Sequence, residues 1–204
     1  MKLLNASIVV KGNGFTPQVV GAKAFADIFS DPPVQVMTTT AITVLTYQDN
    51  FQVVVSDEGV EARRSLPPNG EDRTLQRIVA RVPQLWPLVE PSAVGINFLL
   101  HQGEGDELPS EELANRLVNK GLAEEIFGSS LVGTTSSFSF IMDGARVTVA
   151  AHTGRSVPAN MPAGAIWTFN AHYEPVEDFG QVLATQGRWY DRLIAWIGRF
   201  VNGH

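Results

Sequence analysis

The order of strand-like and helix-like segments constrains the fold of this chain most strongly, because the same order occurs twice. Each half reads as a strand, a helix, three strands and a second helix, with an offset of about 90 residues between the halves. Strands that follow one another directly favour antiparallel pairing over a doubly wound parallel sheet. The pattern therefore predicts an α+β fold with antiparallel sheets and helices packed on one face, built from a βαβββα unit that occurs twice.

The first predicted half is residues 1–90. Its first strand ends in β-branched side chains, and Thr16-Pro17 then supplies an N-cap and a proline suited to the first helical position. Asp31-Pro32-Pro33 would end this helix. The predicted elements are a strand at 3–11, a helix from Pro17 to about Phe29, strands at 34–47, 51–57 and 59–66, and a helix after Asp72 with the apolar stripe Leu75, Ile78, Val79 and Val82.

The second predicted half is residues 91–204. Asp143-Gly144 predicts a hairpin, because a type I′ turn needs positive φ at both central residues. The halves share little sequence identity, so the pattern leaves open a true duplication or two independent segments, and whether their sheets join edge to edge. The predicted elements are a strand at 92–101, a helix near 110–126, strands at 130–142, 145–152 and 164–174, and a helix at about 180–201.

Two segments of the second half resemble a known family. The GINFLL strand and the closing IWTFNAHYEPVEDF segment, followed by an amphipathic helix, resemble a sporadically distributed bacterial family of uncharacterised proteins. In that family alternating acidic residues precede the terminal helix, whereas Asn170 and His172 stand at those positions here. The resemblance covers mainly the last third of the chain, implies a cytosolic bacterial protein and assigns no catalytic residue. The topology is also similar to each half of the TATA-box-binding protein and to sliding-clamp units, an analogy of fold alone.

The composition excludes several classes of protein. The chain has no cysteine, which removes disulfides, thiolate nucleophiles and cysteine-ligated metals. The opening apolar run is interrupted by Asn5 and Ser7, so it predicts a strand rather than a signal peptide. No stretch approaches the roughly 18 apolar residues that would span a membrane. We therefore expect a cytoplasmic protein without a membrane contact.

The charge of the chain points away from nucleic acid and towards proteins or small molecules as partners. Fifteen basic and 21 acidic residues give a formal net charge of −6, which opposes binding to a phosphate backbone. Arg73, Arg77 and Arg81 recur every four residues and so share one face of a predicted helix. This stripe is either a partner-binding surface for an acidic or phosphorylated protein segment, or an ordinary solvated helix face.

Three side chains on the last predicted strands suggest a ligand or metal site. His152, His172 and Glu174 would lie near one another if their strands paired suitably, and two histidines with a carboxylate suit a divalent metal. No HxH or HExxH spacing accompanies them, and the alternative is that these are isolated structural side chains. The sequence also lacks a GxSxG nucleophile motif and a complete phosphate-binding loop.

Trp189, Trp196 and Phe200 share one stripe of the terminal helix. Such a stripe is either core beneath a sheet or a docking surface for a partner or a second copy of the chain. With no catalytic constellation and no cofactor motif, we expect a non-enzymatic cytosolic protein, of bacterial or phage origin, that binds another protein. The competing class is a ligand-binding protein or metal-dependent enzyme that uses a pocket between sheet and helices.

Overall fold

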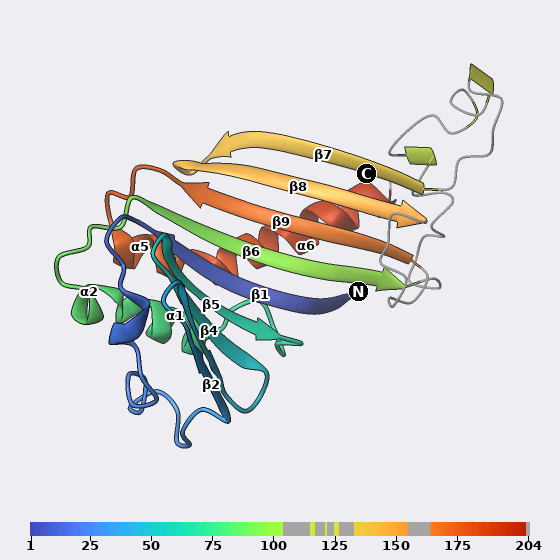
Figure 1. The fold of residues 1–204 in the computed structure, drawn as a ribbon. Coiled ribbons are helices and arrows are strands. Elements are labelled where there is room, and N and C mark those ends of the chain that lie inside the picture. The colour runs from blue at the N-terminus through green and yellow to red at the C-terminus, as the bar shows by residue number, and fades with distance from the viewer. Residues whose placement is uncertain (104–114, 117–120, 122–124, 127–132, 155–163, 203–204) are drawn as a thin grey trace.

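The strands form one continuous antiparallel sheet (Figure 1). The computed structural model describes residues 1–103, 115–116, 121, 125–126, 133–154 and 164–202. The predicted antiparallel α+β class is confirmed, and the two halves share one sheet of nine strands, which answers the question of edge-to-edge joining that the sequence left open. These strands are β1 (Lys2–Lys11), β2 (Gln35–Thr38), β3 (Ile42–Thr46), β4 (Phe51–Ser56), β5 (Gly59–Ser65), β6 (Ala93–Gly103), β7 (Gly133–Met142), β8 (Ala145–Gly154) and β9 (Gly164–Tyr173).

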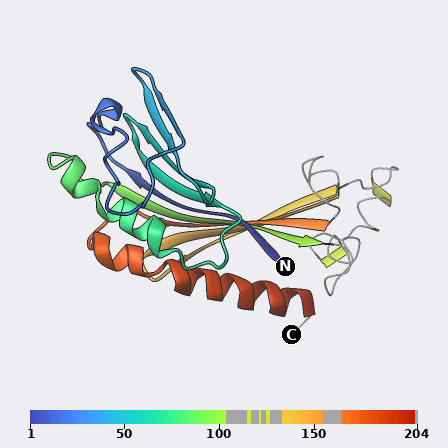
Figure 2. The same ribbon diagram turned by 90° about the horizontal axis from the view of Figure 1, so that it is seen from below.

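In the described residues the helices are fewer than the strands, although the longest element is a helix, α6 (Gln186–Asn202). Figure 2 shows α1, α5 and α6 along one side of the sheet, while the first strands bend away from the plane of the others. None of the helices in the described ranges is long and apolar enough to cross a membrane. The helices are η1 (Pro17–Val19), α1 (Arg73–Ala80), α2 (Val82–Leu85), α5 (Phe179–Ala184) and α6 (Gln186–Asn202).

The order of the strands follows the same rule in both halves when it is read outward from the centre, with five strands in the first half and four in the second. The full order is β2-β3-β4-β5-β1-β6-β9-β8-β7. The first strand of each half, β1 or β6, lies at the centre, and the later strands follow outward in reverse chain order. The two central strands pair antiparallel with Ile8 opposite Ile96, so the halves join edge to edge.

Alternate residues of each strand point towards the helices and form the core. One row of this face runs through Ile8, Ala62, Val53 and Leu45 in the first half, all of them fully buried. The matching row of the second half is Ile96, Ala171, Val147 and Phe140. Its last member differs, because Phe140 on the edge strand keeps 37% of its surface exposed.

Several predicted elements are interrupted. The predicted helix from Pro17 is a short 3-10 turn followed by irregular turns, since Gly21 follows the first turn and Val19 and Val20 are β-branched. The predicted strand 34–47 turns at Thr39, whose hydroxyl accepts hydrogen bonds from the backbone of Ala41 and Ile42. The two remaining helices each divide into two, at Arg81 before Pro83 and at Thr185. The predicted helix at 110–126 lies largely outside the described residues.

The opposite face of the sheet carries an unbroken row of polar side chains across all nine strands. In the described part of the chain, no helix lies over this face of β6, β9 and β8 (Figure 2). Asn170 donates to the side-chain oxygen of Asn97 at 2.6 Å, and Asn97 donates to the Ser7 hydroxyl at 3.2 Å. The row consists of Gln35, Thr46, Gln52, Arg63, Ser7, Asn97, Asn170, Thr148 and Ser139.

Two contacts tie the helices of the halves together. Gln186, at the start of α6, is fully buried, and its side-chain oxygen accepts hydrogen bonds from the Asp72 backbone and the Gln76 amide, both at 3.3 Å. Gly70 lies flat against the ring of Tyr190, where a Cβ atom would come within 1.8 Å of a ring carbon. The core therefore continues through the boundary at residue 91 that separates the halves.

Candidate functional site

An apolar groove opens between α6 and the edge strand β7. Its volume is about 590 Å³, and β8 and β9 form its floor. Val147, Val149 and Phe169 lie in this floor and are buried, whereas Phe140 and Met142 at the edge are 37% and 42% exposed. The lining is completed by Trp189, Arg192, Leu193, Ala195, Trp196 and Arg199 of α6.

The apolar wall of the groove comes from the aromatic stripe of α6. Trp196 makes edge-to-face contacts with Trp167 of β9 at 5.8 Å and with Phe138 of β7 at 5.7 Å between ring centroids. Phe200 stacks on Trp196 at 5.4 Å, while Trp189 is 1% exposed. The stripe therefore forms core at Trp189, as one of the two alternatives expected, and becomes half-buried at Trp196, where it lines the groove.

A second stripe of α6 is basic. Arg188, Arg192 and Arg199 have the spacing i, i+4 and i+11, which places them on one side of the helix over about 16 Å. Arg188 and Arg192 both reach the Asp143 carboxylate in the β7–β8 turn, at 3.7 and 2.5 Å. Arg199 is exposed and lies at the groove with no ionic or hydrogen-bonding partner in the described part of the chain. Among the described residues that line the groove, Arg199 is therefore a cation without a partner beside the apolar surface.

The corresponding place in the first half is filled by the chain itself. Residues 15–29 lie beside α1 over β3 and β4, where Phe25 is 1% exposed and Phe29 stacks on Tyr47 at 3.8 Å. Arg81, the residue that caps the end of α1, forms an ion pair with the Asp27 carboxylate, and Arg77 of α1 donates to the Asp27 carbonyl at 2.9 Å. Apolar side chains over the strands and arginines from the helix thus hold this segment.

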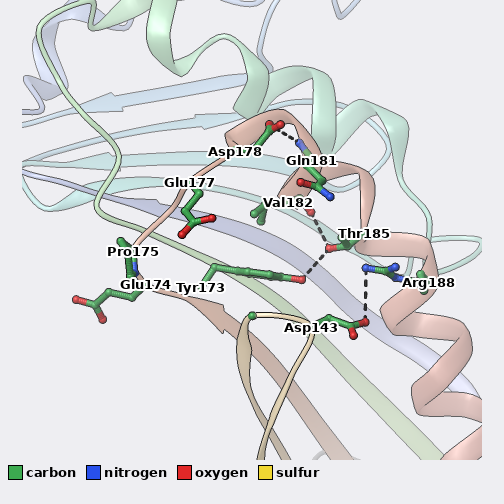
Figure 3. Close-up of a pocket in the computed structure, with 11 residues that line it drawn as sticks. Asp143, Tyr173, Glu174, Pro175, Glu177, Asp178, Gln181, Val182, Thr185 and Arg188 are labelled. Atoms are coloured by element: carbon green, nitrogen blue, oxygen red, sulfur yellow. Dashed lines mark hydrogen bonds and ion pairs between the residues drawn. The ribbon is translucent and has the colours of Figure 1, made fainter.

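A separate polar pocket of about 270 Å³ lies between the β7–β8 turn and the segment from the end of β9 to the start of α6 (Figure 3). Figure 3 shows Tyr173 along its base with the hydroxyl directed at Thr185, and Asp143 meeting Arg188 at one side. The Tyr173 hydroxyl is 3.2 Å from the Thr185 hydroxyl and accepts a hydrogen bond from the Trp189 indole at 2.7 Å. Glu174, Glu177 and Asp178 make the mouth acidic, and Asp178 also caps α5. Such a lining suits a small cation.

The arginines predicted from the sequence do share one face of α1, but two of them have internal partners. Arg77 and Arg81 bind Asp27, as described above. Arg73 is exposed and lies 3.6 Å from the Glu71 carboxylate. The stripe therefore fastens residues 15–29 to the helix, and only Arg73 has the character of a solvated side chain.

The structure does not gather the three residues of the predicted ligand or metal site. His172 and Glu174 lie 3.1 Å apart. His152 is opposite Ile166, six residues along β9 from His172, and bonds to the Thr135 hydroxyl at 3.1 Å. Because a strand rises about 3.3 Å per residue, the two histidines are about 20 Å apart. In the described ranges, no three His, Cys, Asp or Glu side chains lie close enough to hold a metal ion.

Sequence reasoning missed the groove and the basic stripe of α6. The signal for the stripe was present in the spacing of Arg188, Arg192 and Arg199. The groove itself depends on which strand lies at the edge and on what covers it. The pattern along the chain contains neither fact.

Comparison with known proteins yields little. No protein-family model and no curated protein sequence matches the chain. Among solved structures, the chain is similar to the rolling circle replication initiator protein from Geobacillus stearothermophilus, with 8% sequence identity and a TM-score of 0.34, over 89% of this chain and 77% of that chain. A likeness this distant supports no statement about function, so the proposal below depends on the geometry.

Proposed function

We propose that the protein is a non-enzymatic cytosolic interaction protein that binds another protein through the groove between β7 and α6. The observation that supports this best is the difference at matching positions of the sheet. Leu45 is fully buried under residues 15–29, whereas Phe140 is 37% exposed at the groove. Aromatic side chains that are partly exposed beside an arginine are typical of the surfaces that dominate protein interfaces.

Nucleic acid fits this protein less well than a protein partner. The net charge of −6 would repel a phosphate backbone. The polar row on the uncovered face contains amides, hydroxyls and a single arginine, but no aromatic side chain on which a base could stack. A partner with apolar side chains would instead bury Phe140, Met142 and Trp196 at the groove.

A site-specific crosslinking experiment tests the proposal. A photoreactive phenylalanine analogue at position 140 faces the groove, and the same group at Ser139 faces the opposite side of the same strand. We expect a discrete protein adduct from position 140 in cells and none of that mass from position 139. Equal adducts from both positions, or none from position 140, would contradict the proposal.

The competing function is that of a small-ligand binder, and the polar pocket of Figure 3 favours it. Glu174, Glu177 and Asp178 at its mouth would attract a small organic cation such as a diamine. Spermidine at millimolar concentration should then raise the melting temperature by several degrees, and Glu177→Gln should reduce the rise. A flat response at low ionic strength would leave the protein-binding proposal as the better one.

We also propose that the two halves derive from one duplicated βαβββα unit. The mirrored strand order and the central pairing of Ile8 with Ile96 support this. Low sequence identity between the halves is compatible with it, because a fold can be retained while surfaces diverge. On this basis the filled groove of the first half is a guide to what the second half can bind.

A further inference from the structure

The first half shows what kind of segment this architecture holds. Residues 15–29 place Phe25 and Phe29 on β3 and β4, and their Asp27 carboxylate faces α1. Short helical turns bring these side chains to one side of the segment, since the backbone amides of Ala24, Ile28 and Phe29 bond three or four residues back. The segment is therefore amphipathic, with a carboxylate on the side of the helix that supplies the arginines.

The groove of the second half offers the same two kinds of contact. Phe140 and Met142 of β7, with Val147 and Val149 of β8, provide the apolar floor and edge. Arg199 of α6 lies at the side and has no ionic or hydrogen-bonding partner in the described part of the chain. An unpaired guanidinium next to apolar surface favours a carboxylate, with which it can form two parallel hydrogen bonds.

Resting on the proposed function, we infer that the groove binds a short amphipathic acidic helix of a partner protein. The apolar side of that helix covers Phe140, Met142 and Trp196, and a carboxylate of the same helix pairs with Arg199. Arg192 contributes less, because Asp143 already engages it at 2.5 Å. The acidic character of the segment follows from Arg199, which has no ionic partner among the described residues. Its helical form follows from the short helical turns of residues 15–29, in which backbone amides bond three or four residues back.

Two other occupants are less compatible with the structure. In the stretch between β6 and β7, the described residues are Asn115, Arg116, Gly121, Glu125 and Ile126, and all five are exposed. Arg116 donates to the Phe200 carbonyl at 2.9 Å, at the end of α6. A second copy of the chain carries net negative charge, which would suit Arg199. However, its described helices offer no exposed amphipathic acidic segment that could enter the groove.

Two synthetic helical peptides test the inference. Both carry the same leucine stripe, and they differ at two positions seven residues apart, which are glutamate in one peptide and glutamine in the other. We expect the glutamate peptide to bind the full-length protein about tenfold more tightly than the glutamine peptide, measured by fluorescence anisotropy at low salt. Arg199→Gln should abolish this preference, whereas Arg73→Gln, a matched change of an exposed helix arginine, should leave it intact.

The location of binding needs its own variant. Phe140→Ser changes a partly exposed side chain at the edge, so the fold should survive, and it should weaken binding of the glutamate peptide by about tenfold or more. Unchanged binding would place the peptide elsewhere and overturn the inference. Equal affinities of the two peptides for the unmodified protein would overturn it as well.

The alternative occupants give distinct results. A dimer in analytical ultracentrifugation that Phe140→Ser converts to monomer would assign the groove to a second copy and overturn the inference. An internal crosslink from position 140 to the stretch 104–132 would assign it to the chain itself, with the same consequence. If position 140 captures a partner but the peptides bind equally, only the acidic helix is wrong. Absence of any captured partner would instead remove the proposed function.

Discussion

The two halves of this protein follow one rule of strand order, but they differ in what covers the sheet beside their helices. In the first half, residues 15–29 cover β3 and β4, so that Leu45 is fully buried. In the second half, Phe140 at the matching position of β7 is 37% exposed beside α6. The comparison teaches that the same framework can bury one of two matching positions in the core and leave the other exposed at a groove.

Removal of a large side chain from each half gives the largest expected difference. Phe25→Ala should lower the free energy of unfolding by about 3–5 kcal/mol, because Phe25 is fully enclosed and leaves a cavity. Phe140→Ala should lower it by less than about 1 kcal/mol, since solvent already reaches that ring. Urea denaturation measures both. Similar losses for the two variants would mean that the halves do not differ as described.

Alkaline pH should act on the first half through Tyr47. Burial raises the pKa of Tyr47 to about 12 from its ordinary value of 10.0. The unfolded chain therefore ionises at lower pH than the folded chain, so this stabilisation is complete below pH 10 and is lost as pH rises towards 12. The loss should approach about 3 kcal/mol and be absent in Tyr47→Phe. Unfolding curves at several alkaline pH values, compared between the two proteins, measure it.

At neutral pH, removal of the hydroxyl should affect stability less at Tyr47 in the first half than at Tyr173 in the second half. The Tyr47 hydroxyl is buried and has no hydrogen-bond partner among the described residues, so Tyr47→Phe should not destabilise the protein. Tyr173→Phe in the second half should cost about 1–2 kcal/mol, because it leaves the Trp189 indole without its acceptor. Thermal denaturation of both variants tests this, and a large loss of stability in Tyr47→Phe would contradict it.

The contact that joins the halves should be sensitive to a single methyl group. Gly70→Ala would place Cβ inside the ring of Tyr190, so either the loop or α6 must move. We expect a loss of about 1–3 kcal/mol in the free energy of unfolding, of the size seen for overpacked cores. In a protein that already carries Tyr190→Ala, Gly70→Ala should cost less than it does in the unmodified protein, because the ring that clashes is gone. Equal costs in the two backgrounds would contradict the assigned clash.

The smallest expected effect concerns the ion pair that fastens residues 15–29. Asp27→Asn should cost about 0.2–1 kcal/mol, because both side chains are partly exposed to solvent. The cost should shrink as salt is added, since exposed charges are screened. If the loss persists unchanged in high salt, the contact acts through packing instead of charge.

The sequence predicted the class of fold because strand periodicity and turn chemistry are local properties. The hairpin at Asp143-Gly144 is an example, since its positive φ angles belong to the turn residues themselves. The helix predicted from Pro17 failed for a related reason. Its apolar spacing reflects burial of Phe25 and Phe29 on the sheet, which irregular turns satisfy as well as a helix does.

The sites could be predicted only in part. The alignment of Arg73, Arg77 and Arg81 on one face followed from helical spacing, but the internal partner Asp27 lies some fifty residues away in the chain. The separation of His152 from His172 depends on strand register, which periodicity does not define. The polar row from Gln35 to Ser139 depends on the register of every strand pair at once.

The central position of β1 has a consequence for biosynthesis. This strand is made before the other eight strands of the sheet, and β5 can pair with one of its edges as soon as the first half has left the ribosome. Its other edge stays open until residues 93–103 of β6 have been made. An open edge with Val10 and Ile8 alternating along it can pair with strands of other chains. The nascent first half is therefore the stage at which this protein is most exposed to aggregation, and at which a chaperone would protect it.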